Sequence, residues 1–557
     1  LLARGDTAIA GFHPSPLLLF SFTSGRAADN HALMDAGALL PWWTDEHHLN
    51  AFFRPLSSLT HLLDFALFPE RPWLMHLHSL CWFAALLLVV AHVYRHLGAD
   101  RMLAMLGFAL FALDGAHGMT LSWIANRNAL VSATLALPAL SAHHRYVARG
   151  YAPGAWLGPL CFALGLCAGE IALAVLGYLI AYSVVLDRSS LGRRALRLAP
   201  YFALLALWRG AYSWLELGSA GSGAYHDPGR EPLQYALALA SHLPVLLSAQ
   251  LALPLADIWF WGPPEVHLPI WLISLASLGA LAAAGHVLLR EDDEARFWGL
   301  GMVLSGCAVA ASVPGARLLL VPGLGGAALL AKLIVKLLPS STEPRRSWAA
   351  PLLLVIVLLH AVISPVVLLV YASSTRVLSG AIARAQRGIP RGPEIRGRTV
   401  VVVNAPFDVL LSYVQVEREV ERVPRPEHLY WLATASSELT LTTVDASSVR
   451  VRPARGFLLT APERHYRGDP AALSTGASVS LSQMRVRVLE TTADGRPAAA
   501  EFAFSEPLAS PRYLFLRYDH GELVPFELPP PGSSARFPRE DFFATLTEQA
   551  LSGVGSL

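Results

Sequence analysis

Long apolar runs recur through the middle of this chain, and they decide what it can fold into. A helix that crosses the hydrocarbon core of a bilayer needs about 20 mostly apolar residues, because each residue advances the helix by only about 1.5 Å. Such runs occupy residues 74–95, 102–113, 128–146, 155–168, 171–186, 198–215, 271–289, 297–312, 318–338 and 349–371, with weaker candidates at 1–22 and 234–253. We therefore expect a mainly α-helical, polytopic membrane bundle of about 10–12 spans.

The composition agrees with a membrane protein and gives no sign of a nucleic-acid partner. Of the 557 residues, 54% are hydrophobic and only 15% are charged, whereas soluble domains carry about 25% charged residues. The formal net charge of +2 is too small to indicate a polyanionic partner for the chain as a whole. The basic residues are mostly arginine, which, with so much Ala, Leu, Gly and Pro, favours a bacterial source.

Arginines mark the short loops on one side of the predicted bundle. They lie at Arg95 and Arg101, at Arg145 and Arg149, at Arg188 to Arg197, at Arg290 and Arg296, and at Arg345 and Arg346. Short loops rich in Lys and Arg stay in the cytoplasm. Residues 23–73, 114–127, 216–233 and 254–270 are then extracytoplasmic, and we expect the C-terminal region on that side of a bacterial inner membrane.

The C-terminal region is different in character from the rest of the chain. Runs rich in Val, Thr, Tyr and Phe, bounded by Gly and Pro, occur at 399–403, 439–444, 478–489 and 513–518. Such runs are typical of β-strands. We predict a membrane domain over residues 1–375, a linker over 376–398 and a small β-rich extracytoplasmic domain over 399–557.

Ionisable and polar side chains near the ends of the apolar runs are the candidate functional groups, because such groups are costly in a bilayer. Each also has a structural interpretation: Trp123 as an interfacial anchor, Arg127 and Arg317 as snorkelling cations, and Glu170 as a helix-start residue. Asp29 lies in a polar loop, where a carboxylate costs nothing. The candidates are Asp29, Arg54, Asp114, His117, Trp123, Asn126, Arg127, Glu170 and Arg317.

Four stretches of the chain resemble the C-type (GT-C) membrane glycosyltransferases, especially the transmembrane and tetratricopeptide-repeat O-mannosyltransferases. They are Phe53-Arg54-Pro55-Leu56-Ser57, the segment from His117 to Arg127 with its Trp123-Ile124 pair, Glu170, and the segment from Arg317 to Gly325. Their order and spacing agree with that family over residues 25 to 340. The chain lacks tetratricopeptide repeats, and it departs from the family's pattern at Asp114, Gly115, Met119, Gly169, Leu318 and Leu320.

The resemblance implies an enzyme that moves a sugar from a polyprenyl-phosphate carrier to a protein, glycan or lipid acceptor on the outer side. It implies Asp29, Asp114 and His117 as catalytic residues, and Asp29 and Asp114 as candidate ligands of a divalent cation, Mg²⁺ or Mn²⁺. It implies Arg54, Arg127 and Arg317 as ligands of the donor phosphate, with Glu170, Trp123 and Asn126 in support. A transporter or flippase, and a catalytically inactive scaffold of the same fold, are the alternatives.

Overall fold

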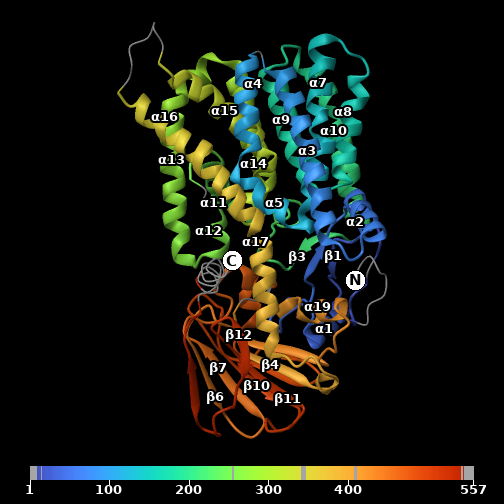
Figure 1. Ribbon diagram of the computed structural model, residues 1–557, viewed down its shortest axis with the longest axis vertical. Helices are drawn as coiled ribbons and strands as arrows, with labels where there is room; N and C mark the ends of the chain where they lie inside the picture. Colours follow the sequence, from blue (N-terminus) through green and yellow to red (C-terminus); the bar gives the residue numbers. More distant parts are fainter. Residues whose placement is uncertain are drawn as a thin grey trace.

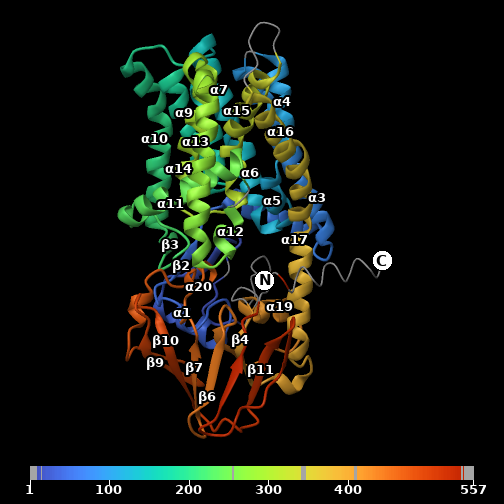
Figure 2. The same ribbon diagram turned by 90° about the vertical axis from the view of Figure 1, so that its left-hand side faces the viewer.

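The molecule is elongated, with helices at one end and β-sheets at the other (Figure 1). The computed structural model describes residues 9–540 and 544, apart from 14, 99, 254–255, 340–346 and 407–410. Seen from the side, one long helix runs from the helical end down to the sheets (Figure 2).

The helices alternate with short loops over most of the chain. In chain order they are α1 (Ala27–Ala36), α2 (Pro55–Leu67), α3 (Pro72–Leu97), α4 (Arg101–Ala112), α5 (Gly118–Ser122), α6 (Arg127–Ala136), α7 (Pro138–Arg149), α8 (Gly154–Leu166), α9 (Leu173–Val185), α10 (Leu191–Trp214), α11 (Pro232–Leu251), α12 (Ala256–Trp261), α13 (His267–Glu291), α14 (Asp293–Val309), α15 (Pro322–Leu337), α16 (Ala349–Val357), α17 (Ser364–Ala385), α19 (Val414–Val420) and α20 (Ala461–Arg464).

Within the part of the chain that the structure describes, three helical stretches are long and apolar enough to cross a membrane: Pro72–Leu97, Pro264–Glu291 and Ala349–Gly388. The pair Arg101–Ala112 and Gly115–Ser122, bent by 43°, makes a fourth if it counts as one span. Large apolar side chains point outward from such helices; Trp73 is 63% exposed and Leu88 is 75% exposed. This is the surface expected of a helix that lies against lipid.

Breaks in the helices explain why fewer uninterrupted spans are found than there are apolar runs. The run over residues 128–146 is divided between α6 and α7, because Pro138 lacks an N–H and begins the second helix. The runs 155–168 and 171–186 become α8 and α9, separated by Gly169 and the short turn η4 (Glu170–Ala172). A hydropathy profile detects an apolar run, but it does not detect a break of the helix inside that run.

The C-terminal region is β-rich, as the sequence predicts. Its strands are β4 (Thr399–Ala405), β5 (His428–Thr434), β6 (Leu439–Thr443), β7 (Ser448–Pro453), β8 (Ser478–Ser480), β9 (Met484–Thr491), β10 (Pro497–Phe504), β11 (Tyr513–Asp519), β12 (Glu522–Pro525) and β13 (Ser534–Phe537). A six-stranded antiparallel sheet has the order β13-β6-β7-β10-β9-β8, and a four-stranded sheet has the order β12-β11-β4-β5. Strands β11, β4 and β5 are parallel, and α19 crosses between β4 and β5.

The first loop of the chain belongs to the core of this β-rich region. Trp42 donates its indole N–H to the carbonyl of Leu432 at 3.1 Å, and the rings of Trp43 and Trp431 meet edge to face at 6.4 Å. Asp35 at the end of α1 accepts from the Tyr430 hydroxyl at 3.0 Å. Two distant segments of the chain therefore form one apolar core.

A small sheet connects the first loop to the helices. It has the order β1-β2-β3, from β1 (Ser21–Ser24), β2 (Leu49–Ala51) and β3 (Gly218–Ala220). Backbone bonds continue this connection into the β-rich region, where Gly223 N donates to Arg464 O at 2.9 Å and Gly468 N to Gly221 O at 3.0 Å. The two ends of the molecule are thus joined through several chain segments.

Candidate functional site

A partly open cleft lies between α17 and the helices α11 and α12. The turn η2 (Gly115–His117), the turn η6 (Ala316–Leu320) and the π-helical segment η7 (Leu358–Ile363) complete its walls. Most lining residues are apolar. The polar ones are Asp114, Asp257, His360, Ser364 and Tyr371.

Asp114 is fixed at the first wall of the cleft by the break between α4 and α5. Its Oδ1 caps η2 by accepting from Ala116 N at 2.9 Å, and its Oδ2 accepts from Gln250 Nε2 at 2.8 Å. Gly115 permits this placement, because a Cβ there would lie only 2.8 Å from Val367 Cγ1 of α17. The carboxylate predicted from the sequence therefore faces a cleft, held by a turn that requires glycine.

Asp257 lies on the opposite wall, and the sequence analysis missed it. Its Oδ1 accepts from Ala316 N at 3.0 Å, and its side chain is hydrogen-bonded to Tyr371. Asp257 stands alone in the apolar segment 256–261, so its only signal in the sequence is one carboxylate in a loop that is predicted to be extracytoplasmic. Its role depends on two partners that are far away in the sequence.

Arg317 follows Ala316, which lines the cleft, and is the candidate cation of the site. Its guanidinium lies 5.8 Å from the centre of the Trp123 ring. Within the described part of the chain, no hydrogen bond or ion pair holds this half-buried side chain. An arginine with its donors unused is available to an anionic ligand.

The β-rich region reaches the surroundings of Arg317 through His465. The His465 ring contacts those of Tyr225 and His48, with centroids 6.3 and 5.7 Å apart. Burial first, and then the nearby His48 and Arg317, lower the pKa of His465 to about 3. A neutral imidazole therefore stands beside the cation at neutral pH.

Arg54 and Glu170 form a second polar group at the same end of the helical region. Arg54 donates to Glu170 Oε2 from Nε and from Nη2, both at 2.7 Å, and its guanidinium lies over the Phe20 and Phe52 rings. Tyr212 donates its hydroxyl to the other Glu170 oxygen. The structure brings these two predicted residues together as an ion pair, so Glu170 orients Arg54.

Arg127 is buried and its hydrogen bonds are internal. Its Nη1 lies 2.5 Å from Asp64 Oδ2. The other donors reach Ser79 Oγ at 2.9 Å and Met75 O at 2.6 Å. With no exposed surface and with these partners, the guanidinium joins α2, α3 and α6 rather than facing the cleft.

His117 and Asn126 lie behind the cleft. His117 is buried, its Nε2 is 2.9 Å from Phe111 O, and its ring packs on Phe83 and Phe111. Asn126 Nδ2 donates to Thr120 Oγ1 at 3.2 Å. Both side chains stabilise the broken segment that carries Asp114.

Asp29 lies on α1, and its contacts are local. Its carboxylate accepts from Ser24 Oγ at 2.7 Å and lies 3.1 Å from His13 Nε2. The hydrogen bond from Ser24 is the main reason that the pKa of Asp29 is lowered. Among the described residues, the Asp29 carboxylate forms no hydrogen bond or ion pair with Asp114, Asp257 or Arg317.

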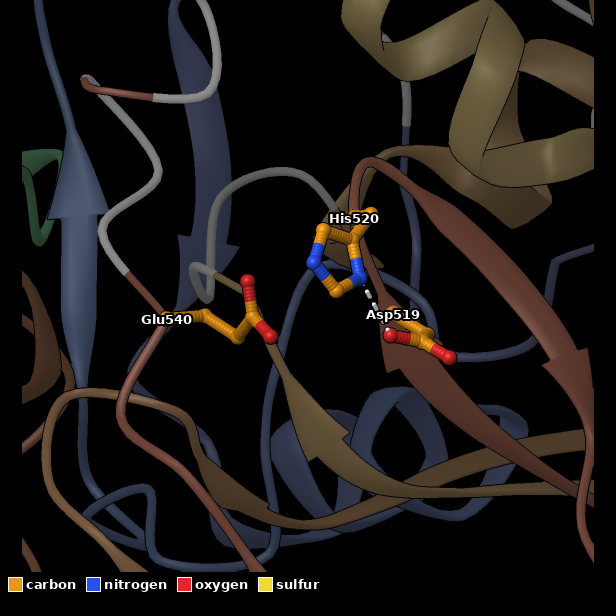
Figure 3. Close-up of side chains that lie close together, drawn as sticks. All are labelled: Asp519, His520 and Glu540. Carbon is orange, nitrogen blue, oxygen red and sulfur yellow. Dashed lines mark hydrogen bonds and ion pairs between the residues drawn. The ribbon is translucent and has the colours of Figure 1, made fainter.

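A different group of side chains could hold a metal ion at the carboxyl end of β11. Asp519, His520 and Glu540 each offer a ligand atom, and these atoms lie within 4.8 Å of one another (Figure 3). Carboxylate and imidazole donors suit Zn²⁺. However, Asp519 already accepts from Arg517 at 2.6 Å, and the His520 ring is exposed. This cluster is separate from Asp29 and Asp114, the predicted metal ligands.

The site thus combines two carboxylates that line a cleft, a neighbouring arginine without a hydrogen bond or an ion pair among the described residues, and a histidine from the β-rich region. Comparison of the chain with family models, curated proteins and solved structures finds no match.

Proposed function

We propose that this chain is a membrane glycosyltransferase, which moves a sugar from a polyprenyl-phosphate carrier to an extracytoplasmic acceptor. In this proposal the shorter apolar helices complete a polytopic bundle around the three long spans. The bundle lies in a bacterial inner membrane, and the β-rich region lies outside the cell membrane.

The observation that supports the proposal most is the cleft with two carboxylates in its walls and an arginine next to it in the chain. Asp114 and Asp257 line it, and Arg317 directly follows one of its lining residues. Apolar walls suit a lipid carrier, a guanidinium suits a phosphate, and a carboxylate can accept the proton of an acceptor hydroxyl. The cleft and the adjacent arginine together therefore offer a group for each part of the reaction.

The chemistry assigned to these groups is a displacement at the anomeric carbon. The acceptor oxygen forms the new bond to that carbon as the bond to the carrier phosphate breaks. The acceptor proton passes to Asp114 or Asp257, and Arg317 stabilises the negative charge on the departing phosphate. The two carboxylates are also the hard oxygen donors that Mg²⁺ or Mn²⁺ would use, if the reaction requires a cation.

The transfer of a labelled sugar tests the proposal directly. Protein in lipid nanodiscs is incubated with a panel of polyprenyl-phosphate sugars and with candidate acceptors. Asp114→Asn, Asp257→Asn and Arg317→Ala are each expected to lower the transfer rate by about 100-fold or more. Arg317→Lys should retain part of the rate, because it keeps the charge but loses the planar fork.

Two controls and one comparison make this result interpretable. Asp100→Asn removes the negative charge of the helix cap at the other end of α4 but keeps a capping oxygen. Arg290→Ala removes a cation at the end of α13; both variants should transfer at the wild-type rate. Asp29→Asn tests whether Asp29 is the base, which stays a prediction from the resemblance. Wild-type rates in the Asp114, Asp257 and Arg317 variants together would exclude the proposed site.

One structural feature favours transport as the second candidate. The π-helical segment η7 interrupts the helix formed by α16 and α17, and it places His360 at the cleft. Such segments occur often at functional sites, and polar groups inside a span are typical of transporters. Flux of a lipid-linked sugar into proteoliposomes without a glycosylated product would support transport. Binding of that lipid without flux or turnover would indicate an inactive scaffold.

A further inference from the structure

The outer face of the six-stranded sheet carries a concentration of arginine that the composition conceals. Along β7, β9 and β13 the outward positions hold Arg, while the inward positions are buried. The outward charged residues of the sheet are Arg450, Arg452, Arg485, Arg487, Arg536, Glu490 and Glu501. Five arginines against two glutamates leave a formal charge of +3 on one face, more than the +2 of the whole chain.

The strand register arranges these side chains in rows that cross the sheet. In the longest row, the strands present in turn Ser534, Thr442, Arg450, Glu501, Arg487 and Ser478. In a second row, Thr440 lies between Arg536 and Arg452. Hydroxyl groups therefore lie beside guanidinium groups in both rows.

The glutamates neutralise only part of this face. Glu501 lies between two arginines, 3.2 Å from Arg487 and 3.8 Å from Arg450, and Glu490 pairs with Arg452. Within the described residues, neither the Arg485 side chain nor the Arg536 side chain has a hydrogen bond or an ion pair. Two exposed guanidinium groups on the face therefore keep their donors unused.

We propose that this face, called here the arginine face, binds an acidic polysaccharide. The arginines of each row lie two strands apart, or about 10 Å, which is close to the length of one disaccharide in an extended chain. Guanidinium groups bind carboxylates with two parallel hydrogen bonds, and the Ser and Thr hydroxyls can bond to sugar hydroxyls. Many weak contacts along a polymer add to a useful affinity.

An acidic peptide and an anionic bilayer surface fit the arginine face less well. An extended peptide adds to the edge of a sheet rather than to its face. The strands run roughly along the long axis of the molecule, with the apolar helices at the far end (Figure 1). The arginine face consequently stands along that axis and cannot lie flat on the bilayer that holds those helices. The proposal rests on the proposed function in one respect, since it identifies the acceptor as an acidic glycan.

Binding by the full chain in nanodiscs of neutral lipid tests the proposal without any donor lipid. The probes are hyaluronan, with one carboxylate per disaccharide, and neutral dextran. Hyaluronan should bind, and dextran should not. Arg485→Ala with Arg487→Ala, and Arg452→Ala with Arg536→Ala, should each weaken hyaluronan binding at least 10-fold. The control variant combines Arg391→Ala with Arg396→Ala, two positions outside the sheets, and should change hyaluronan binding less than 2-fold.

Equal binding of dextran, or unchanged binding in both double variants, would overturn the proposal. Tighter binding of poly-glutamate or of phosphatidylglycerol vesicles than of hyaluronan would overturn it too, since each indicates another class of partner. A melting temperature equal to that of the wild type confirms that the variants are folded. Since no transfer is measured, Asp114→Asn should bind hyaluronan normally, which separates this result from the failure of the proposed function.

Discussion

At the scale of single residues, the buried pair of Arg127 and Asp64 shows how a charge is kept inside the helices. Asp64 also accepts from His78, with Nδ1 to Oδ1 at 2.6 Å, and Trp82 Nε1 donates to His78 Nε2 at 3.0 Å. Because Nε2 accepts a hydrogen bond, the proton of the neutral ring is on Nδ1. The hydrogen bond from Trp82 thus defines the tautomer of His78.

The substitution Arg127→Ala should lower the free energy of unfolding by about 3–5 kcal/mol, because it leaves the Asp64 carboxylate buried without its cation. Thermal unfolding in detergent measures the loss. The double variant with Asp64→Ala removes both charges and should recover part of it, and Arg290→Ala serves as the exposed control. A variant of normal stability with reduced sugar transfer would instead indicate a direct role for Arg127 in the reaction.

Part of the candidate site could be predicted from the sequence, because some of its residues are polar side chains beside apolar runs. Asp114, Arg317 and the pair Arg54 and Glu170 are rare polar residues beside apolar runs, so their residue type revealed them. The grouping did not follow from the sequence, because it depends on long-range contacts such as Ala316 to Asp257, 59 positions apart. His465 was missed because it lies in a region where polar residues are ordinary.

At the scale of elements, the end of α1 determines how the first loop joins the β-rich region. Gly37 caps α1 in the left-handed conformation, with φ 63°. Its N–H donates to the Met34 carbonyl, and the N–H of Ala38 donates to the Leu33 carbonyl. A Cβ at Gly37 would lie 1.6 Å from the Leu429 carbonyl oxygen on β5. The glycine is therefore required twice, by the turn and by the close approach of two backbones.

Gly37→Ala should therefore destabilise the junction by more than the cost of backbone strain alone, which is about 1 kcal/mol. Gly150 provides the matched control, because it caps α7 with φ 64° and no atom lies within 4 Å of an added Cβ. Thermal unfolding of the two alanine variants gives the comparison. An equal loss of stability in both would show that the approach to Leu429 does not constrain α1.

The elements were predicted better than their connections. The apolar runs coincide with helices and the β-type runs with strands, because both follow from local periodicity and residue type. The helix break at Asp114 agrees with the predicted end of the run over 102–113. The break at Pro138, inside the run over 128–146, was not predicted, because tertiary packing decides whether such a residue ends a helix. The insertion of residues 27–48 into the β-rich core had no local signal at all.

At the scale of the whole molecule, the junction between the helices and the β-rich region depends on histidines that stay neutral. Burial is the main cause that lowers the pKa of His48 to about 4 and of His465 to about 3, from a usual value of 6.5. Arg467 packs at the same junction, donates to the Trp43 and Thr44 carbonyls, and lies 3.5 Å from Asp45. A proton on either imidazole would therefore add positive charge beside Arg317 and Arg467.

Acidification should consequently weaken the molecule below pH 6.5. Between that value and the folded pKa, the unfolded chain binds more protons than the folded chain, so stability falls as the pH falls. The expected loss is about 1.4 kcal/mol for each histidine at pH 5.5. Melting temperatures at pH 7.5 and 5.5 measure it, and His48→Gln with His465→Gln should reduce the difference. An unchanged difference would assign the effect to other groups.

The sharing of one core by the first loop and the C-terminal strands has a consequence for biosynthesis. Trp42 and its partner Leu432 are 390 positions apart. At about 5–20 residues per second, a ribosome needs roughly 20–80 s to supply that partner. Through this interval the nascent loop lacks the partners of its two tryptophans, so in the orientation proposed above a chaperone that shelters aromatic segments on the extracytoplasmic side would raise the yield of mature protein.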